Sequence, residues 1–204
     1  GYPIPNVQIE NVWYDFGGFS CQPNLLPGIM PLLDRDEPEI YIWMYFNAFA
    51  ATYREETNAM VEHPQPILGH SNSAWVKTSD EANSMKWLKY MFVYASANEL
   101  YIGRAIPREW FTSTAPIGVT NAATVFGEVS ALYTAVPDAD IIRLEIELNL
   151  IDTPSRITAR FRHPQKLPIK AVKLNGEHYT EYDAEKGDVY LTGISGKTTV
   201  EAEY

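Results

Sequence analysis

The hydrophobic pattern of this chain changes its period near residue 105, and this change limits the folds that the chain can adopt. Before this point apolar residues recur at the spacing of a helix, and after it they alternate as in a half-buried strand. A run of helices followed by a run of strands is typical of an α+β protein. We therefore predict a helical part at residues 1–105 and an antiparallel β-sandwich at residues 106–204.

The composition supports a packed protein and argues against two classes of partner. The 204 residues are 46% hydrophobic and 13% aromatic, which is enough for a sizeable core. The net charge of −10 argues against nucleic acid as a partner. No apolar run reaches the roughly 20 residues that a membrane span needs. A single cysteine, Cys21, excludes an internal disulfide. Because the chain begins with Gly1 and shows no signal peptide, we expect a trimmed or mature part of a longer protein.

Two helices are predicted in the first part. The first begins near Asp36, a predicted cap, has Pro38 in its first turn and is predicted to end in the stretch at residues 58–66. It is apolar nearly all round, which predicts burial on several sides. The second is predicted from the stretch "KTSDEANSMKWLKYMFVYASA", in which Thr78 and Glu81 form a capping-box pattern.

Short strands with polar turns are predicted after residue 105. The pair Asn175-Gly176 indicates a two-residue hairpin turn, and "DAEKGD" indicates a turn rather than a calcium loop. His163, at the end of a strand, is interpreted as a backbone hydrogen bonder. The stretch "RITARFRH" alternates, which predicts an apolar face and a polar face: Ile157, Ala159 and Phe161 against Arg156, Arg160 and Arg162.

Three segments together carry a family resemblance: "LYIGRAIPREWF", "GVTNAATVFGEVS" and "ITARFRHPQKLPIKAVKLNGEHYTEYD". They resemble the C-terminal end of large bacterial six-hairpin glycosidases, with enzymes of the alpha-L-rhamnosidase type as the nearest catalytic relatives. The resemblance covers about residues 36–204. It implies the last helical hairpins of an (α/α)6 toroid followed by a C-terminal sandwich, with carbohydrate as the ligand and no metal or organic cofactor. It also implies that the missing toroid portion, or another subunit, covers the helical region.

Glu62 is the candidate catalytic carboxylate. In six-hairpin enzymes the paired carboxyl groups lie at helix ends on the open face of the toroid, and Glu62 lies at a predicted helix end just before Pro64. Val61 stands where the family pattern has an aromatic residue. Glu55 and Asn58 would share a face with Glu62 if the helix extends that far. The alternative is a solvated acid at the end of a helix.

The candidate sugar-binding residues lie in two other stretches. "VWYDFGGF" places Trp13, Tyr14 and Asp15 beside two glycines, where aromatic rings can stack on sugar faces and a carboxylate can bind hydroxyls. Trp75 and His63 are candidates of the same kind. The alternative for the aromatic residues is packing against a neighbouring part of the protein, and the histidines carry little specificity for a metal.

Three functions remain open from the sequence. In the first, the chain is the C-terminal portion of a glycoside hydrolase and is inactive by itself, because the second carboxyl group lies elsewhere. In the second, it is a non-catalytic carbohydrate-binding or structural module. In the third, which the resemblance disfavours, it is an unrelated two-domain interaction protein. The sequence does not fix the cellular compartment, although a periplasmic or secreted protein is favoured.

Overall fold

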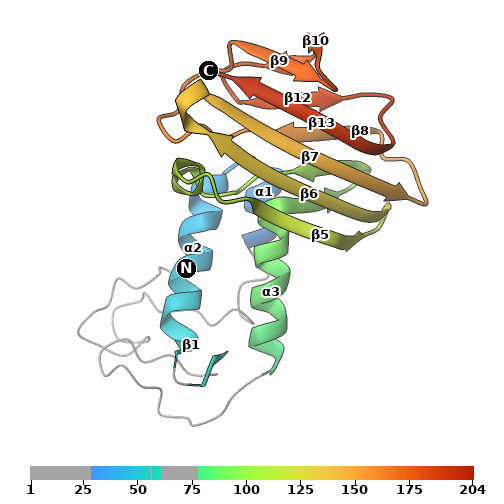
Figure 1. Cartoon of the computed structure of the whole chain (residues 1–204). Helices are drawn as coiled ribbons and strands as arrows, with labels where there is room; N and C mark the ends of the chain where they lie inside the picture. The colour runs from blue at the N-terminus through green and yellow to red at the C-terminus, as the bar shows by residue number, and fades with distance from the viewer. Residues whose placement is uncertain (1–28, 56, 61–77) are drawn as a thin grey trace. The chain divides into compact units, whose positions relative to one another are not determined.

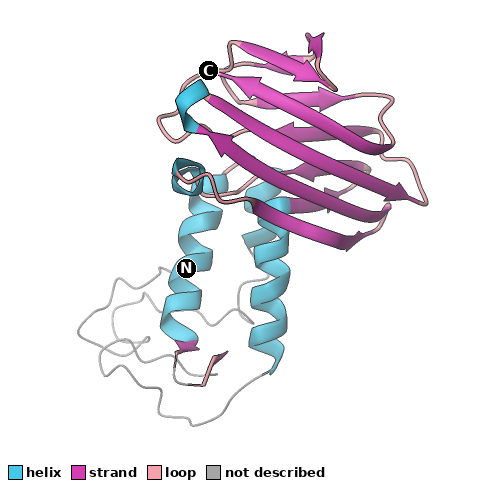
Figure 2. Cartoon of the chain, viewed as in Figure 1, coloured by secondary structure: helices cyan, strands magenta, loops and turns pink. Residues whose placement is uncertain are grey.

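The computed structural model describes residues 29–55, 57–60 and 78–204 (Figure 1). The chain divides into two compact units, Gly1–Leu88 and Lys89–Tyr204. Helices lie in the first part of the chain and strands dominate the second (Figure 2), so the predicted α+β class, with a helical part and a β-sandwich, is confirmed. The domain boundary at residues 105/106 stays a prediction; the division between the two compact units falls inside a helix.

The described part of the first unit is mainly helical. A proline lies in the first turn of two of its helices, where its missing N–H costs nothing. The prediction that Asp36 caps the helix at Pro38–Thr52 is wrong. The backbone of Asp36 is left-handed, with φ of 62°, and Glu37 is the N-cap without a side-chain capping bond. The elements are α1 (Met30–Asp34), α2 (Pro38–Thr52), β1 (Tyr53–Arg54), β2 (Ala59–Met60) and α3 (Thr78–Phe92), whose last residues belong to the second unit.

Helices α2 and α3 are joined by buried tyrosines. The Tyr41 hydroxyl donates to the Trp87 carbonyl at 2.8 Å, and the Tyr45 hydroxyl lies 3.3 Å from Ser84 Oγ. Burial raises the pKa of Tyr45. Together with Met44 these tyrosines form a buried stripe at helical spacing along α2.

Both main helices end earlier than the sequence predicts. Helix α3 stops at Phe92, and the buried, β-branched Val93 begins β3 (Val93–Ser96), which turns back at Ala97, with φ of 50°, into β4 (Glu99–Ile102). Helix α2 stops at Thr52, where Tyr53 takes an extended backbone conformation. Glu55 and Asn58 therefore lie in a turn between β1 and β2 rather than on one helical face.

The second unit contains two sheets. The six-stranded sheet has the order β10-β9-β13-β7-β6-β5 and the five-stranded sheet the order β11-β12-β8-β4-β3, in which β4 and β8 form a parallel pair. The strands are β5 (Ile117–Thr124), β6 (Gly127–Val136), β7 (Ile141–Leu150), β8 (Arg156–Arg160), β9 (Ala171–Leu174), β10 (Glu177–Tyr179), β11 (Tyr182–Asp183), β12 (Asp188–Leu191) and β13 (Gly196–Glu203).

Tyr133 links the two sheets at the centre of the core. It lies on β6, and its hydroxyl is within hydrogen-bond distance of the carbonyls of Ile102 on β4, at 3.3 Å, and Arg160 on β8, at 3.0 Å. Its ring also meets the ring of Phe161 edge to face, at 5.7 Å between centroids. Burial raises the pKa of Tyr133 well above its usual value. The buried side chains of both sheets thus form one core.

In the stretch at residues 156–162, the predicted polar face is exposed at Arg156 but buried at its other two arginines. Ile157, Ala159 and Phe161 are buried as expected, but Arg160 and Arg162 are buried as well. Arg160 is accommodated by Asp188, which lies directly opposite on β12 and accepts two hydrogen bonds from the guanidinium. A buried charge is tolerated when it is paired in this way.

The turns in the last third of the chain are those that the sequence predicts. Asn175 and Gly176 join β9 to β10 with positive φ values of 52° and 87°, as a tight hairpin turn requires. In "DAEKGD", Asp183 Oδ1 accepts hydrogen bonds from the backbone amides of Glu185 and Lys186. No helix in the described part of the chain is long and apolar enough to cross a membrane.

Candidate functional site

The residues that the sequence predicts for catalysis and sugar binding lie outside the described residues. This applies to the candidate carboxylate Glu62 and to all the candidate binding residues. Their roles therefore stay predictions. The binding candidates are Trp13, Tyr14, Asp15, His63 and Trp75.

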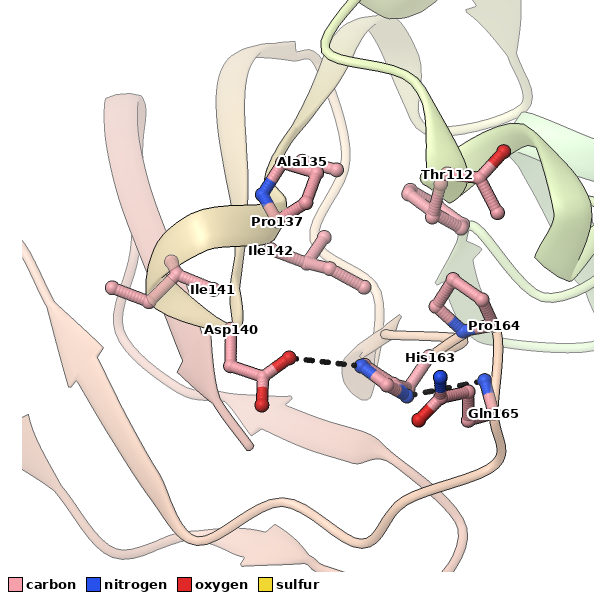
Figure 3. A pocket seen from close by; sticks show the side chains of 10 residues that line it. Thr112, Ala135, Pro137, Asp140, Ile141, Ile142, His163, Pro164 and Gln165 are labelled. Carbon is pink, nitrogen blue, oxygen red and sulfur yellow. Dashed lines mark hydrogen bonds and ion pairs between the residues drawn. The ribbon is translucent and has the colours of Figure 1, made fainter.

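Within the second unit, a pocket of about 260 Å³ opens where β6 ends and β7 begins (Figure 3). The 3₁₀-helix η4 (Pro137–Ala139) connects these strands and forms one side. The 3₁₀-helix η3 (Arg108–Thr112) and the segment at residues 163–165 form the others. Segments far apart in the sequence therefore contribute to one small concave site.

Asp140 is positioned by its backbone. It closes η4 in the left-handed conformation, with φ of 55°, which Asp and Asn adopt more readily than most residues. Its amide donates to the Pro137 carbonyl at 3.1 Å, and its own carbonyl accepts from the Tyr204 amide at 2.9 Å. These bonds hold the carboxylate at the rim of the pocket, where its side chain is half exposed.

His163 faces Asp140 from the opposite side of the pocket (Figure 3). Its Nε2 lies 3.4 Å from Asp140 Oδ1, and its Nδ1 accepts a hydrogen bond from the Gln165 amide at 3.2 Å. Both ring nitrogens of His163 therefore have a polar neighbour, and the imidazole is held beside the carboxylate. The interpretation of His163 as a backbone hydrogen bonder is therefore confirmed.

Tyr204 and Arg108 hold His163 in place. The Tyr204 ring lies against the imidazole, at 4.5 Å between centroids, and Arg108 Nη1 donates to the His163 carbonyl at 3.0 Å. Burial raises the pKa of Tyr204, and the charge of Arg108 opposes this rise. Within the described residues the Tyr204 hydroxyl has no hydrogen-bond partner.

The pocket has the chemistry of a binding site. Asp140 is the single carboxylate among its lining residues, whereas acid/base hydrolysis of a glycosidic bond needs two carboxyl groups. Within residues 29–55, 57–60 and 78–204, no group of three or more His, Cys, Asp or Glu side chains is placed to hold a metal ion. A carboxylate at the rim of an apolar floor can instead bind hydroxyl groups.

A second polar cluster is structural. Glu99 on β4 accepts hydrogen bonds from the Tyr101 hydroxyl and, at 2.9 Å, from Arg156 at the start of β8. The hydrogen bond from Tyr101 is the main cause that lowers the pKa of Glu99, and Arg156 adds to it. Glu99 and Arg156 are register partners in the parallel pair, so this cluster fixes the pairing of β4 with β8.

The sequence did not single out Asp140 or Gln165. Asp140 follows a Pro-Asp-Ala turn, and Gln165 follows His163-Pro164, so each stretch signals only a turn. The signal that joins them is tertiary, since the pocket brings together segments separated by 20 residues or more, such as residues 140–142 and 163–165.

Comparison with known proteins gives structural similarity alone. No protein-family model matches the chain, and no curated protein sequence matches it. A solved structure described as "Glycoside hydrolase" aligns with 80% of this chain, at 10% sequence identity and a TM-score of 0.37. The chain spans 29% of the length of that structure.

Proposed function

We propose that this chain is the C-terminal portion of a carbohydrate-active glycoside hydrolase of the six-hairpin type. In this proposal residues 1–105 are the last helical hairpins of an (α/α)6 toroid, and residues 106–204 are an accessory β-sandwich. The proposal draws on the sequence motifs that resemble such enzymes and on the α+β arrangement of the chain.

The observation that carries the proposal is the second apolar stripe of α2. Helix α2 already has a buried stripe that includes Tyr41 and Tyr45. Three apolar side chains outside this stripe are exposed: Ile40 (39%), Trp43 (47%) and Phe46 (36%). Exposed apolar side chains at i, i+3 and i+6 gather on one side of a helix, and such a surface favours association. A neighbouring helix of a larger toroid would cover it.

The proposed chemistry is hydrolysis by two carboxyl groups. Glu62 is assigned as the base that activates water or as a carboxylate that contacts sugar, while the acid would come from the rest of the toroid. Trp13, Tyr14 and Trp75 would stack on sugar rings, and Asp15 and His63 would bind hydroxyl groups. The chain alone would then bind without hydrolysing.

The experiment compares the chain with the product of its full gene. Aryl glycosides are supplied to each, with Glu62→Gln in both backgrounds and Glu55→Gln as the matched control. We expect no turnover by the chain and turnover by the longer protein, which Glu62→Gln lowers by at least a hundredfold and Glu55→Gln leaves unchanged. A gene that encodes no further helical hairpins before Gly1 would contradict the proposal.

A non-catalytic carbohydrate-binding module is the second candidate, and the Asp140 pocket favours it. The pocket combines an apolar floor with polar groups at its rim, which is the usual composition of a small-molecule site. Carbohydrate binding by a full gene product that never hydrolyses a glycoside would support this candidate over the hydrolase.

A further inference from the structure

We propose that the pocket at Asp140 binds one neutral sugar unit. The choice of carbohydrate rests in part on the proposed function, and the inference adds a location and a ligand class to it. The geometry of the pocket carries the rest.

The size of the pocket suits one ring rather than an extended chain. Its volume is about 260 Å³, just below the range of about 300–1,000 Å³ that is usual for drug-sized ligands. The buried side chains of Phe111, Ala135 and Ile142 form its floor, and the exposed residues Asp140 and Gln165 lie at its rim. An apolar floor beneath polar groups matches a sugar ring, which has C–H faces and hydroxyl edges.

The charges at the pocket exclude an anionic ligand. Asp140 is a carboxylate, and it only accepts hydrogen bonds when it is ionised. No lysine or arginine is among the residues that line the pocket. A phosphate or carboxylate would therefore meet a negative charge with no opposing positive charge at the rim.

The same groups favour a neutral ligand over a cation. An ammonium group would find one carboxylate, which already faces Nε2 of His163 at 3.4 Å. Phe111, the one phenylalanine among the lining residues, is 3% exposed, so little of its ring face is open to a cation–π contact. Neutral hydroxyl groups, by contrast, can donate to the carboxylate, and they can both donate to and accept from the side-chain amide of Gln165.

His163 acts as a positioning residue for this site. It is buried, its Nδ1 accepts a hydrogen bond from the backbone amide of Gln165, and its Nε2 points at Asp140. The carboxylate is therefore oriented before the ligand arrives, which lowers the entropic cost of binding.

The test is a titration of the ¹⁵N-labelled full chain followed by NMR. The ligands are neutral hexoses, pentoses and deoxyhexoses, with glucuronate as the anionic probe and glucosamine as the cationic probe. We expect one or more neutral sugars to bind with a millimolar Kd and to shift the amides of Asp140, Ile141 and Gln165. Glucuronate is expected to bind at least tenfold more weakly than the matching neutral sugar.

Three substitutions test whether the sugar binds in this pocket. Asp140→Asn keeps a residue that tolerates the left-handed backbone and removes the charge, and it is expected to weaken binding about tenfold, as expected for loss of a charge-assisted hydrogen bond. Asp138→Asn removes the same charge from an exposed position on η4 that does not line the pocket, and it is expected to leave Kd unchanged. Gln165→Ala is a second probe of the rim and is expected to weaken binding as well.

Three outcomes would overturn the inference: no shift with any neutral sugar at 50 mM (about fifty times a 1 mM Kd), tighter binding of glucosamine than of glucose, or shifts confined to residues far from the pocket. Because the readout is binding, these outcomes leave the hydrolysis test of the gene product unaffected.

Discussion

Arg160 and Asp188 face each other across strands β8 and β12 and form a buried, two-pronged ion pair. Arg160 Nε and Nη2 donate to Asp188 Oδ1 and Oδ2, each at 2.6 Å, and both side chains are more than 90% buried. The two residues are also register partners in the sheet. This pair therefore fixes the pairing of β8 with β12 as well as balancing a buried charge.

Asp188→Asn is expected to destabilise the chain strongly. The substitution leaves the buried Arg160 charge without its carboxylate, and removing one partner of a buried pair costs about 3–5 kcal/mol. The free energy of unfolding, measured by urea titration, gives the loss directly.

The matched control is Glu201→Gln, which breaks the more exposed pair that Arg143 and Glu201 form between β7 and β13. Exposed pairs contribute about 0–1 kcal/mol, so a small change is expected. Equal losses in the two variants would contradict the importance assigned to the Arg160–Asp188 pair.

Gly103→Ala is expected to destabilise the core more than an ordinary substitution of a left-handed glycine. Gly103 has φ of +73°, and an added Cβ would lie 2.1 Å from the Tyr133 hydroxyl oxygen and 2.8 Å from the Arg160 carbonyl oxygen. Tyr133 cannot move away without losing its hydrogen bonds in the core. We expect a loss of at least about 3 kcal/mol from backbone strain and overpacking together.

Gly176→Ala provides the comparison. Gly176 has φ of +87° and nothing within 4 Å of the added Cβ. The loss of stability in this variant therefore reflects backbone strain alone, about 1 kcal/mol. Urea unfolding of both variants separates the steric part from the strain. A loss for Gly103→Ala no larger than that for Gly176→Ala would disprove the steric argument.

Local patterns predicted the parts of the fold that local physics decides. The alternation in "IIRLEIELNL" predicted β7, in which Ile142, Leu144, Ile146 and Leu148 are buried. The Asn175-Gly176 pair predicted its hairpin because few other residues tolerate two successive positive φ values. Helix α3 was predicted to begin near Thr78, and it does.

Tertiary contacts decide the features that the sequence did not predict. Arg160 and Arg162 alternate with apolar residues and so indicate a solvated face, but Asp188, 28 residues further along the chain, provides the partner that permits burial of Arg160. Val93 follows a helical pattern without a break, yet pairing with Ile102 makes it a strand residue. The candidate pocket likewise depends on Asp140 and His163, which no local motif connects.

Trp43→Gln is expected to reduce association of the isolated chain while leaving its stability nearly unchanged. Trp43 is 47% exposed on α2, and glutamine is a good helix former. Binding of the dye ANS and the apparent mass from light scattering should both fall, with the thermal midpoint shifted by only about 2 °C, because surface substitutions usually change stability by less than about 0.5 kcal/mol.

Tyr41→Gln on the buried side of the same helix is the control. It removes the hydrogen bond to the Trp87 carbonyl and places an amide in the core, so it should lower the midpoint by about 4–12 °C, as a loss of 2–3 kcal/mol would in a chain of this size. No fall in ANS binding or association after Trp43→Gln would contradict the assignment of the exposed stripe as an interface.

Tyr133→Phe is expected to change the dependence of stability on alkaline pH. Burial raises the pKa of Tyr133 in the folded chain, whereas the unfolded value is about 10. Above that pH the unfolded state loses this proton and the folded state keeps it, so the stability from the neutral phenol is present below about pH 10 and falls by about 1.4 kcal/mol per pH unit above it. At pH 7 the variant should be about 1 kcal/mol less stable than the natural chain, because two carbonyls lose a buried donor. Urea unfolding at pH 7, 9, 10 and 11 should show this difference shrinking and vanishing near pH 11. A difference that stays constant over this range would mean that Tyr133 ionises equally in both states.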